Sequence, residues 1–422
     1  MEAVARLRCL ICGRAYRPDE IAYVCPDHGR EGVVDVEYDY AAIGAAWSPD
    51  TLPAVAGMWR YRPLLPVGER SSEPPILVGG TPLIDAPRLA AAAGLARVWV
   101  KDEGRQPTAS LKDRASAMAV VKAAERGIGT ITTASTGNAA AALAGMCAAA
   151  GVRAVIFVPE SAPQAKITQL LVFGASVVLV AGSYDQAVQL SMEAADRRGW
   201  YNRNTGFNPY MTEGKKTVVY EICEQLGWHV PDAIAVGVGD GCIIGGVHKG
   251  LRDLLALGWI DRMPRLIGVQ AEGAQFLAEA WRNGEDPFTK PPAPADTVAD
   301  SISAGMPRDR LKAMAAVLET DGVFVTVGDD EILAAIPEVA RLSGVFGEPA
   351  AAAAWAGTGA AVRNGFIGAG DEVVVINTGS GLKDVAAATR GAESAGVTVV
   401  RASADVAGLD EALDRLTTIG GT

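Results

Sequence analysis

Lys101-Asp-Glu-Gly-Arg-Gln-Pro-Thr-Ala-Ser-Leu-Lys-Asp-Arg114 is the stretch that decides the fold. Its Pro-Thr step ends an apolar run, and Ser110 is predicted to cap a helix that runs from Leu111. Lys112 then lies in the first turn, where the positive end of the helix dipole disfavours an ammonium group. A neutral imine formed with an aldehyde would remove that penalty. Taken alone, Lys112 could also be a solvated lysine that pairs with Asp113.

Short apolar runs alternate with Ala-rich helical runs on both sides of this stretch, from about Ile76 onward. The predicted strands are Arg97–Lys101, Thr130–Thr133, Ala154–Val158, Ser176–Val180, Ala233–Val236, Arg265–Val269 and Glu372–Ile376. Such short, apolar strands are typical of buried parallel sheets. We therefore predict an α/β fold with two open, mostly parallel sheets and helices on both faces, which bind ligands at the carboxyl ends of the strands.

The pattern also predicts the domain organisation. A small unit built around three cysteines occupies residues 1–35, and a C-terminal tail with one strand and one helix occupies residues 391–422. The strand is predicted over Val397–Arg401 and the helix over Gly408–Thr417. The larger domain is predicted to comprise residues 76–120 and 206–390, and the smaller domain residues 121–205.

Composition excludes several classes of protein. The 422 residues carry a formal net charge of −11, and no long basic stretch offers a surface for nucleic acid. The uncharged run Gly127–Val152 is long enough to span a membrane, but its six Ser, Thr and Asn side chains favour a buried strand, a polar loop and a helix. Met1–Arg8 lacks the apolar region of a signal peptide, and the sparse cysteines favour a reducing cytoplasm.

Three further motifs follow predicted strands. Ser135-Thr-Gly-Asn138 opens an Ala-rich helix and offers backbone N–H groups to a carboxylate or phosphate. Gly237-Val-Gly-Asp-Gly241 can form a nest of N–H groups for a phosphate. Thr378-Gly-Ser-Gly381 places hydroxyl groups at the end of the last strand. Each motif alone has an ordinary alternative, an N-cap or a Gly-rich turn.

Taken in order, the four motifs resemble the fold-type II pyridoxal-phosphate (PLP) enzymes, the tryptophan synthase β superfamily. Gly80-Thr-Pro-Leu83 and Gly347-Glu-Pro-Ala350 add to a resemblance that covers roughly residues 76 to 390. It implies that Lys112 holds PLP as a Schiff base and moves protons at the substrate's Cα. The cofactor-binding residues that it implies are Lys112, Asn138, Gly237, Val238, Gly239, Asp240, Gly241, Thr378 and Ser380.

Within this superfamily, threonine synthases are the most similar. Residues 204–217 resemble their pattern Asn-Ser-x-Asn-Pro-aromatic-Arg-x-Glu-Gly-x-Lys-Thr. The resemblance implies conversion of O-phosphohomoserine and water to threonine and phosphate. It also implies substrate contacts from Ser135, Thr136, Gly137, Thr205 and Lys216.

The chain departs from that pattern at several positions. Met211 stands where the family has an arginine that binds the substrate phosphate, and Lys215 and Lys216 are the nearest cations that could replace it. In the motif around Lys112, Ala109 stands where the family usually has a glycine. Thr297–Ile302 resembles the corresponding stretch of threonine and serine dehydratases.

These departures keep two alternatives open. The first is a threonine/serine-type ammonia-lyase or another PLP enzyme of β-elimination or replacement, which needs no phosphate contact. The second is a catalytically inactive PLP-binding or zinc-ribbon interaction module, against which the intact Lys112, Asn138 and glycine loop argue.

The N-terminal unit predicts a metal site. Cys9, Cys12, Cys25 and His28 have the spacing of a tetrahedral zinc ribbon, so we expect a structural zinc ion. Free thiols are the alternative. The expected partners are a small amino-acid substrate and, by resemblance, a second copy of the chain in a homodimer, with neither nucleic acid nor membrane.

Overall fold

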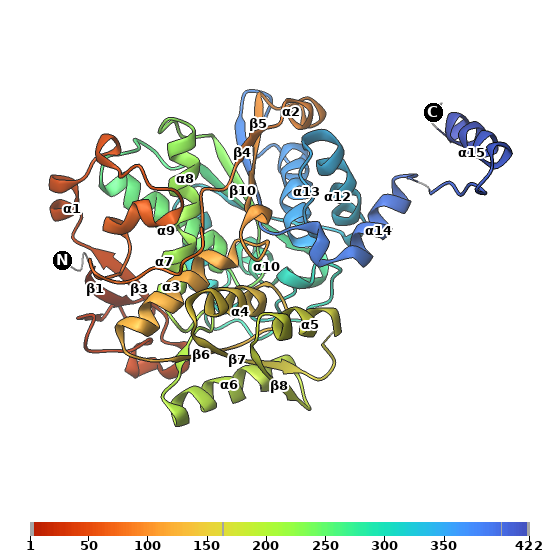
Figure 1. Cartoon of the computed structure of the whole chain (residues 1–422). Coiled ribbons are helices and arrows are strands. Elements are labelled where there is room, and N and C mark those ends of the chain that lie inside the picture. The colour runs from red at the N-terminus through yellow and green to blue at the C-terminus, as the bar shows by residue number, and fades with distance from the viewer. Residues whose placement is uncertain (1–3, 163, 398, 420–422) are drawn as a thin grey trace.

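The computed structural model describes residues 4–162, 164–397 and 399–419 (Figure 1). Its larger sheet has six strands in the order β12-β11-β10-β13-β5-β4, all parallel except for β4, which pairs with β5 in the antiparallel direction. The strands are β4 (Leu83–Asp85), β5 (Arg97–Asp102), β10 (Ala233–Gly237), β11 (Arg265–Ala271), β12 (Val323–Val327) and β13 (Glu372–Asn377). The central strand β10 is buried along its whole length, as the apolar run Ala233–Gly237 requires.

Helices cover both faces of this sheet. One face packs against α2 (Pro87–Ala93), α12 (Asp329–Ser343) and α13 (Pro349–Arg363). The other packs against α3 (Lys112–Glu125), α7 (Tyr210–Lys215), α8 (Thr217–Gln225), α9 (Cys242–Ala256), α10 (Phe276–Asn283) and α11 (Arg310–Leu318). Helix α14 (Val385–Ser394) lies against α12. Short 3-10 helices span Pro26–Glu31, Pro49–Thr51, Met58–Leu64, Glu103–Arg105, Glu272–Ala274, Asp300–Ile302 and Gly381–Lys383.

The smaller sheet has four parallel strands in the order β8-β7-β6-β9. They are β6 (Thr130–Ala134), β7 (Arg153–Pro159), β8 (Ser176–Val180) and β9 (Tyr201–Asn202). Helices α4 (Asn138–Ala150), α5 (Gln164–Val172) and α6 (Tyr184–Arg198) connect them, in the lower part of Figure 1. The uncharged run Gly127–Val152 forms β6, a loop and α4, as predicted.

The N-terminal unit is a three-stranded antiparallel sheet in the order β2-β1-β3, followed by α1 (Tyr40–Ala46). Its strands are β1 (Val4–Cys9), β2 (Ala15–Tyr16) and β3 (Val34–Tyr38), so the sheet continues past the predicted boundary at residue 35. Leu7, Val34 and Val36 belong to the same buried apolar cluster as the helices of the large domain. The unit is therefore packed onto the core of the large domain.

The α/β prediction is confirmed, and a strand forms at each of the seven predicted positions. The C-terminal prediction is partly wrong: the described residues of Val397–Arg401 form no strand, and residue 398 lies outside the described residues. The predicted helix forms as α15 (Val406–Ile419), which lies apart from the other helices in Figure 1. Among the described residues, no helix has the length and apolar character needed to cross a membrane.

Candidate active site

Lys112 is the first residue of α3, but the local capping differs from the prediction. Leu111, not Ser110, occupies the N-cap position, and no side chain caps the helix. Ser110 instead forms an isolated antiparallel bridge with Gly379, because the Leu111 N–H donates to the Thr378 carbonyl at 3.0 Å. This bridge holds the start of α3 against the turn that follows β13.

Asp113 does not pair with Lys112. Its carboxylate accepts hydrogen bonds from the Thr108 N–H at 2.6 Å and from the Thr108 hydroxyl at 2.5 Å. Burial raises the pKa of Asp113 to about 6. Between these residues Ala109 adopts φ 61°, a left-handed conformation that costs a non-glycine residue about 1–2 kcal/mol. The strained turn presents the Lys112 side chain to the cavities beside it.

The glycine loop after β10 requires its glycines. A Cβ at Gly237 would lie 2.3 Å from the Ala350 carbonyl oxygen, and one at Gly239 would lie 2.8 Å from the Ile302 Cα. Gly241 has φ +85° and precedes the 15-residue helix α9. The loop therefore presents backbone N–H groups at a helix N-terminus without side chains in the way, which fits the phosphate group of PLP.

One cavity brings most of the predicted cofactor residues together. Its lining includes Lys112, Asn138, Gly237, Val238, Gly239, Asp240, Gly241 and Thr378. Ser380 is not among the lining residues: its hydroxyl accepts from the Leu382 N–H and caps the last 3-10 helix, and the side chain lines a neighbouring cleft. Of the two hydroxyl residues predicted after β13, only Thr378 reaches this cavity.

Glu348 is a residue of this cavity that sequence reasoning did not assign a role. Its Oε1 accepts a hydrogen bond from the Asn138 Nδ2 at 2.7 Å. Burial raises the pKa of Glu348, while the charges of Lys383 and Lys112 lower it. The motif Gly347-Glu-Pro-Ala350, used above only for the resemblance, was the signal that could have identified it.

A larger cleft of about 620 Å³ adjoins the first cavity. The predicted substrate residues Ser135, Thr136, Gly137 and Thr205 line it, and Lys112 lines both spaces. Lys216 is not brought to the cleft, since its Nζ donates to Asp253 at 2.7 Å and pairs with Glu213. Arg203, which sequence reasoning missed, does line the cleft.

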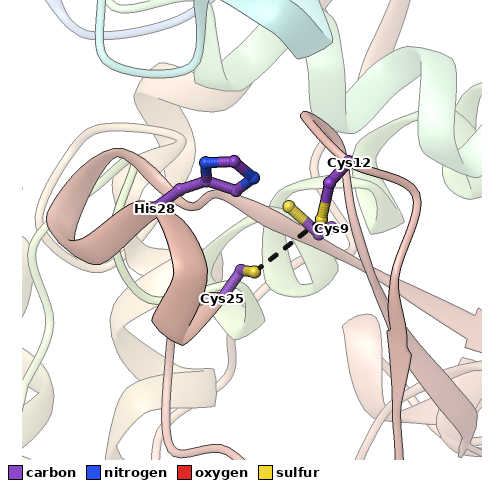
Figure 2. Close-up of side chains that lie close together, drawn as sticks. All are labelled: Cys9, Cys12, Cys25 and His28. Atoms are coloured by element: carbon purple, nitrogen blue, oxygen red, sulfur yellow. Dashed lines mark hydrogen bonds between the residues drawn. The ribbon is translucent and has the colours of Figure 1, made fainter.

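The N-terminal unit assembles the predicted metal ligands. Figure 2 shows Cys9 and Cys12 on one side and Cys25 and His28 on the other, with the four side chains close together. The four donor atoms lie within 4.8 Å of one another, and the Cys12 and Cys25 sulfurs are 4.0 Å apart. Two thiolates on one tetrahedral zinc ion would be about 3.8 Å apart. The His28 Nε2 is buried without a hydrogen-bond partner, so the donor set fits zinc.

Comparison with known proteins agrees with this geometry. The family model described as pyridoxal-phosphate dependent enzyme matches residues 75–379. The threonine synthase of Methanocaldococcus jannaschii is 37% identical over 391 residues, which cover 92% of this chain and 95% of the relative. That of Methanosarcina acetivorans is 40% identical, with coverage of 90% and 92%.

Solved structures share the fold. The processed threonine deaminase isoform 2 of Solanum lycopersicum aligns with a TM-score of 0.61 at 23% identity, covering 81% of this chain and 88% of its own. A fungal L-serine ammonia-lyase from Rhizomucor miehei aligns with a TM-score of 0.64 at 22% identity, covering 74% and 97%. The chain belongs to the family of pyridoxal-phosphate dependent enzymes of fold-type II, and it is a PLP-dependent lyase with threonine synthases among its relatives.

Proposed function

We propose that this enzyme is a threonine synthase, which converts O-phosphohomoserine and water to threonine and phosphate. The observation that carries the proposal is the position of Lys112, which lines both the glycine-loop cavity and the adjoining cleft. A single amine can thus reach the cofactor on one side and the substrate on the other. Two threonine synthases match the chain over about nine tenths of its length.

Each residue has a role in this proposal. PLP supplies an electron sink for charge that develops on the substrate's carbon atoms. Lys112 would hold the cofactor and would transfer protons at the substrate's Cα, Cβ and Cγ. Phosphate leaves from Cγ with the electrons of the C–O bond, water adds its hydroxyl group at Cβ, and a proton is delivered to Cγ, which becomes the methyl group of threonine. Asn138, the loop Gly237 to Gly241 and Thr378 line the same cavity and would hold the cofactor there, with the phenolic oxygen, the phosphate and the pyridine nitrogen as their respective partners. Ser135, Thr136 and Gly137 hold the substrate carboxylate.

Release of phosphate from O-phosphohomoserine, measured beside release of ketoacid from threonine and serine, tests the proposal. We expect phosphate release by the wild type and none by Lys112→Ala. Ketoacid release without phosphate release would replace threonine synthase with an ammonia-lyase.

A specific observation favours that second candidate. Met211, at the position of the family's arginine, is buried in the apolar core and offers no charge. Ser301, from the stretch that resembles dehydratases, lies 3.5 Å from the Asn138 Nδ2 at the cofactor cavity. The substrate assay above decides between the two.

We also propose that Cys9, Cys12, Cys25 and His28 bind one structural zinc ion. All four ligands would be protein groups, which leaves no open position for catalysis. The homodimer and the cytoplasmic location expected from the sequence remain predictions.

A further inference from the structure

Two fully buried cations, Arg203 in the lining of the cleft and Lys215 in α7, form no ion pair with any carboxylate of the described residues. Arg203 is 1% exposed and Lys215 is 0% exposed. Within the described part of the chain, the Lys215 Nζ and the Arg203 Nη2 form no hydrogen bond. The Arg203 Nε donates to the Ser116 hydroxyl group at 3.2 Å, and the Arg203 Nη1 donates to the Thr205 hydroxyl group at 3.4 Å. Burying an unpaired charge is costly, so the arrangement is one that an anionic ligand would complete.

The two cations share one electrostatic environment. Burial lowers the pKa of Lys215, and the nearby charges of Arg203 and Lys112 lower it further, while Cys242 and Asp309 raise it. Burial also lowers the pKa of Arg203, to about 10. Helix α9 packs closely against Lys215, because a Cβ at Gly246 would lie only 3.0 Å from the Lys215 Cβ. Lys215 therefore lies within the electrostatic reach of Arg203 and Lys112, which both line the cleft.

The structure also separates the two lysines that could replace the missing family arginine. Lys216 pairs with Asp253 and Glu213, whereas the Lys215 Nζ has no hydrogen-bond partner among the residues that the structure describes. Arg203 lines the cleft of Ser135 to Gly137 and not the glycine-loop cavity. This position favours an anion carried by the substrate over the phosphate of the cofactor.

We propose that Arg203 and Lys215 together bind the phosphate monoester of the substrate, in place of the arginine that Met211 replaces. Thr205 completes the site, because its hydroxyl accepts from Arg203 and retains its own proton for a phosphate oxygen. The inference rests on the proposed function, which requires a phosphorylated substrate.

Binding of inorganic phosphate to the PLP-loaded enzyme, measured by calorimetry, tests the site directly. Arg203→Gln and Lys215→Met should each weaken binding roughly tenfold or more, because each removes a charge-assisted contact. Arg308→Gln is the matched control: Arg308 lines the same cleft but pairs with Asp185 at 2.8 Å. We expect it to change phosphate affinity by about twofold or less.

Thermal unfolding gives a second readout, because a structural role for Lys215 and a phosphate-binding role predict opposite changes in the Tm of Lys215→Met. Lys215→Met removes a buried charge that has no partner, so without phosphate its Tm should equal or exceed that of the wild type. Saturating phosphate should raise the Tm of the wild type and leave that of Arg203→Gln/Lys215→Met nearly unchanged. A large fall in the Tm of Lys215→Met would make Lys215 a structural residue and overturn the proposal.

Other outcomes would also overturn it. Unchanged phosphate affinity in both variants would show that the anion binds elsewhere. Loss of PLP from Lys215→Met would place Lys215 on the cofactor's phosphate instead. Failure of the proposed function looks different: O-phosphohomoserine would release no phosphate, while phosphate binding would still depend on Arg203 and Lys215.

Discussion

Two of the groups of buried cations in this enzyme differ in what surrounds them. In the first, which we call the paired cluster, the Arg114 guanidinium donates to Glu103 at 2.7 Å and to Glu221 at 2.7 Å. Lys101 donates to the second carboxylate oxygen of Glu221 at 2.8 Å. In the second, the unpaired cations Arg203 and Lys215, only hydroxyl groups of described residues accept from Arg203, and none accepts from Lys215.

The presence or absence of carboxylate partners indicates a structural role for the paired cluster and a ligand-binding role for the unpaired cations. In the paired cluster, burial alone would raise the pKa of Glu221, but the charges of Arg114 and Lys101 hold that pKa well below its usual range. The cluster is complete and ties α3 and α8 to β5. Burial of the unpaired cations costs free energy that a bound anion would offset. Such unpaired buried charges concentrate at functional sites.

The largest effect is expected in the paired cluster. Glu221→Gln leaves Arg114 and Lys101 without one of their carboxylates, and breaking a buried ion pair in this way costs about 3–5 kcal/mol. Urea unfolding of the variant and of Lys215→Met measures both groups on one scale. The comparison fails if Glu221→Gln lowers the free energy of unfolding by no more than Lys215→Met does.

The zinc ligands extend the comparison to a second incomplete group, since the His28 Nε2 also lacks a partner. We expect about one zinc per chain in the wild type and almost none in Cys9→Ser or Cys25→Ser. Because the N-terminal unit shares the main core, loss of zinc should also lower the Tm. Elemental analysis and thermal unfolding check both points, with Cys147→Ser, a buried cysteine outside the site, as control. Full zinc in both ligand variants would contradict a ribbon.

Met211→Arg sharpens the comparison because sequence and structure predict opposite results. The family pattern alone suggests that the substitution restores phosphate binding. The structure shows a 1% exposed side chain in the apolar core, on the helix that carries Lys215. We expect overpacking and a third buried charge to lower stability by about 1–3 kcal/mol, without a gain in kcat/KM for phosphate release.

Met211→Leu, which nearly conserves volume, is the control and should cost less than about 1.5 kcal/mol. A higher kcat/KM for Met211→Arg would mean that the phosphate lies beside residue 211, and that Arg203 and Lys215 do not bind it.

The smallest effect is a pH dependence of phosphate affinity. Lys215 binds an anion only when protonated, and burial lowers its pKa. Affinity should therefore be full below that pKa and decline as the pH rises through it, at a lower pH than for an ordinary lysine. Calorimetry at a series of pH values above neutrality should show this decline in the wild type. Lys215→Arg should move it to higher pH, and Lys215→Met should lack it. An identical profile in all three proteins would remove Lys215 from the site.

The sequence predicted the features that local chemistry determines. The runs Arg97–Lys101 and Ala233–Val236 are short, apolar and bounded by breakers, so their strands were recognisable. The glycine loop was recognisable because only glycine fits a backbone that passes so close to Ala350 and Ile302.

Features that depend on distant neighbours were not predictable. Ser110 has the chemistry of an N-cap, but its pairing with Gly379, far along the chain, decides its conformation. The different fates of Lys215 and Lys216 depend on Asp253 in α9, which pairs with only one of them. Arg203 belongs to no quoted motif, and only the packing of β9 beside β6 brings it to the cleft.

The central claim is that Lys112, which lines both cavities, is the lysine that binds PLP covalently. Borohydride reduction followed by peptide mapping tests this claim most directly. The chain offers a rival in Lys215, a buried lysine whose pKa is lowered by burial and by the charges of Arg203 and Lys112, because a lysine with a lowered pKa is a more reactive amine. We predict that reduction fixes PLP on Lys112, and that Lys112→Ala abolishes both this label and turnover. A label on Lys215 or on any other lysine would contradict the account.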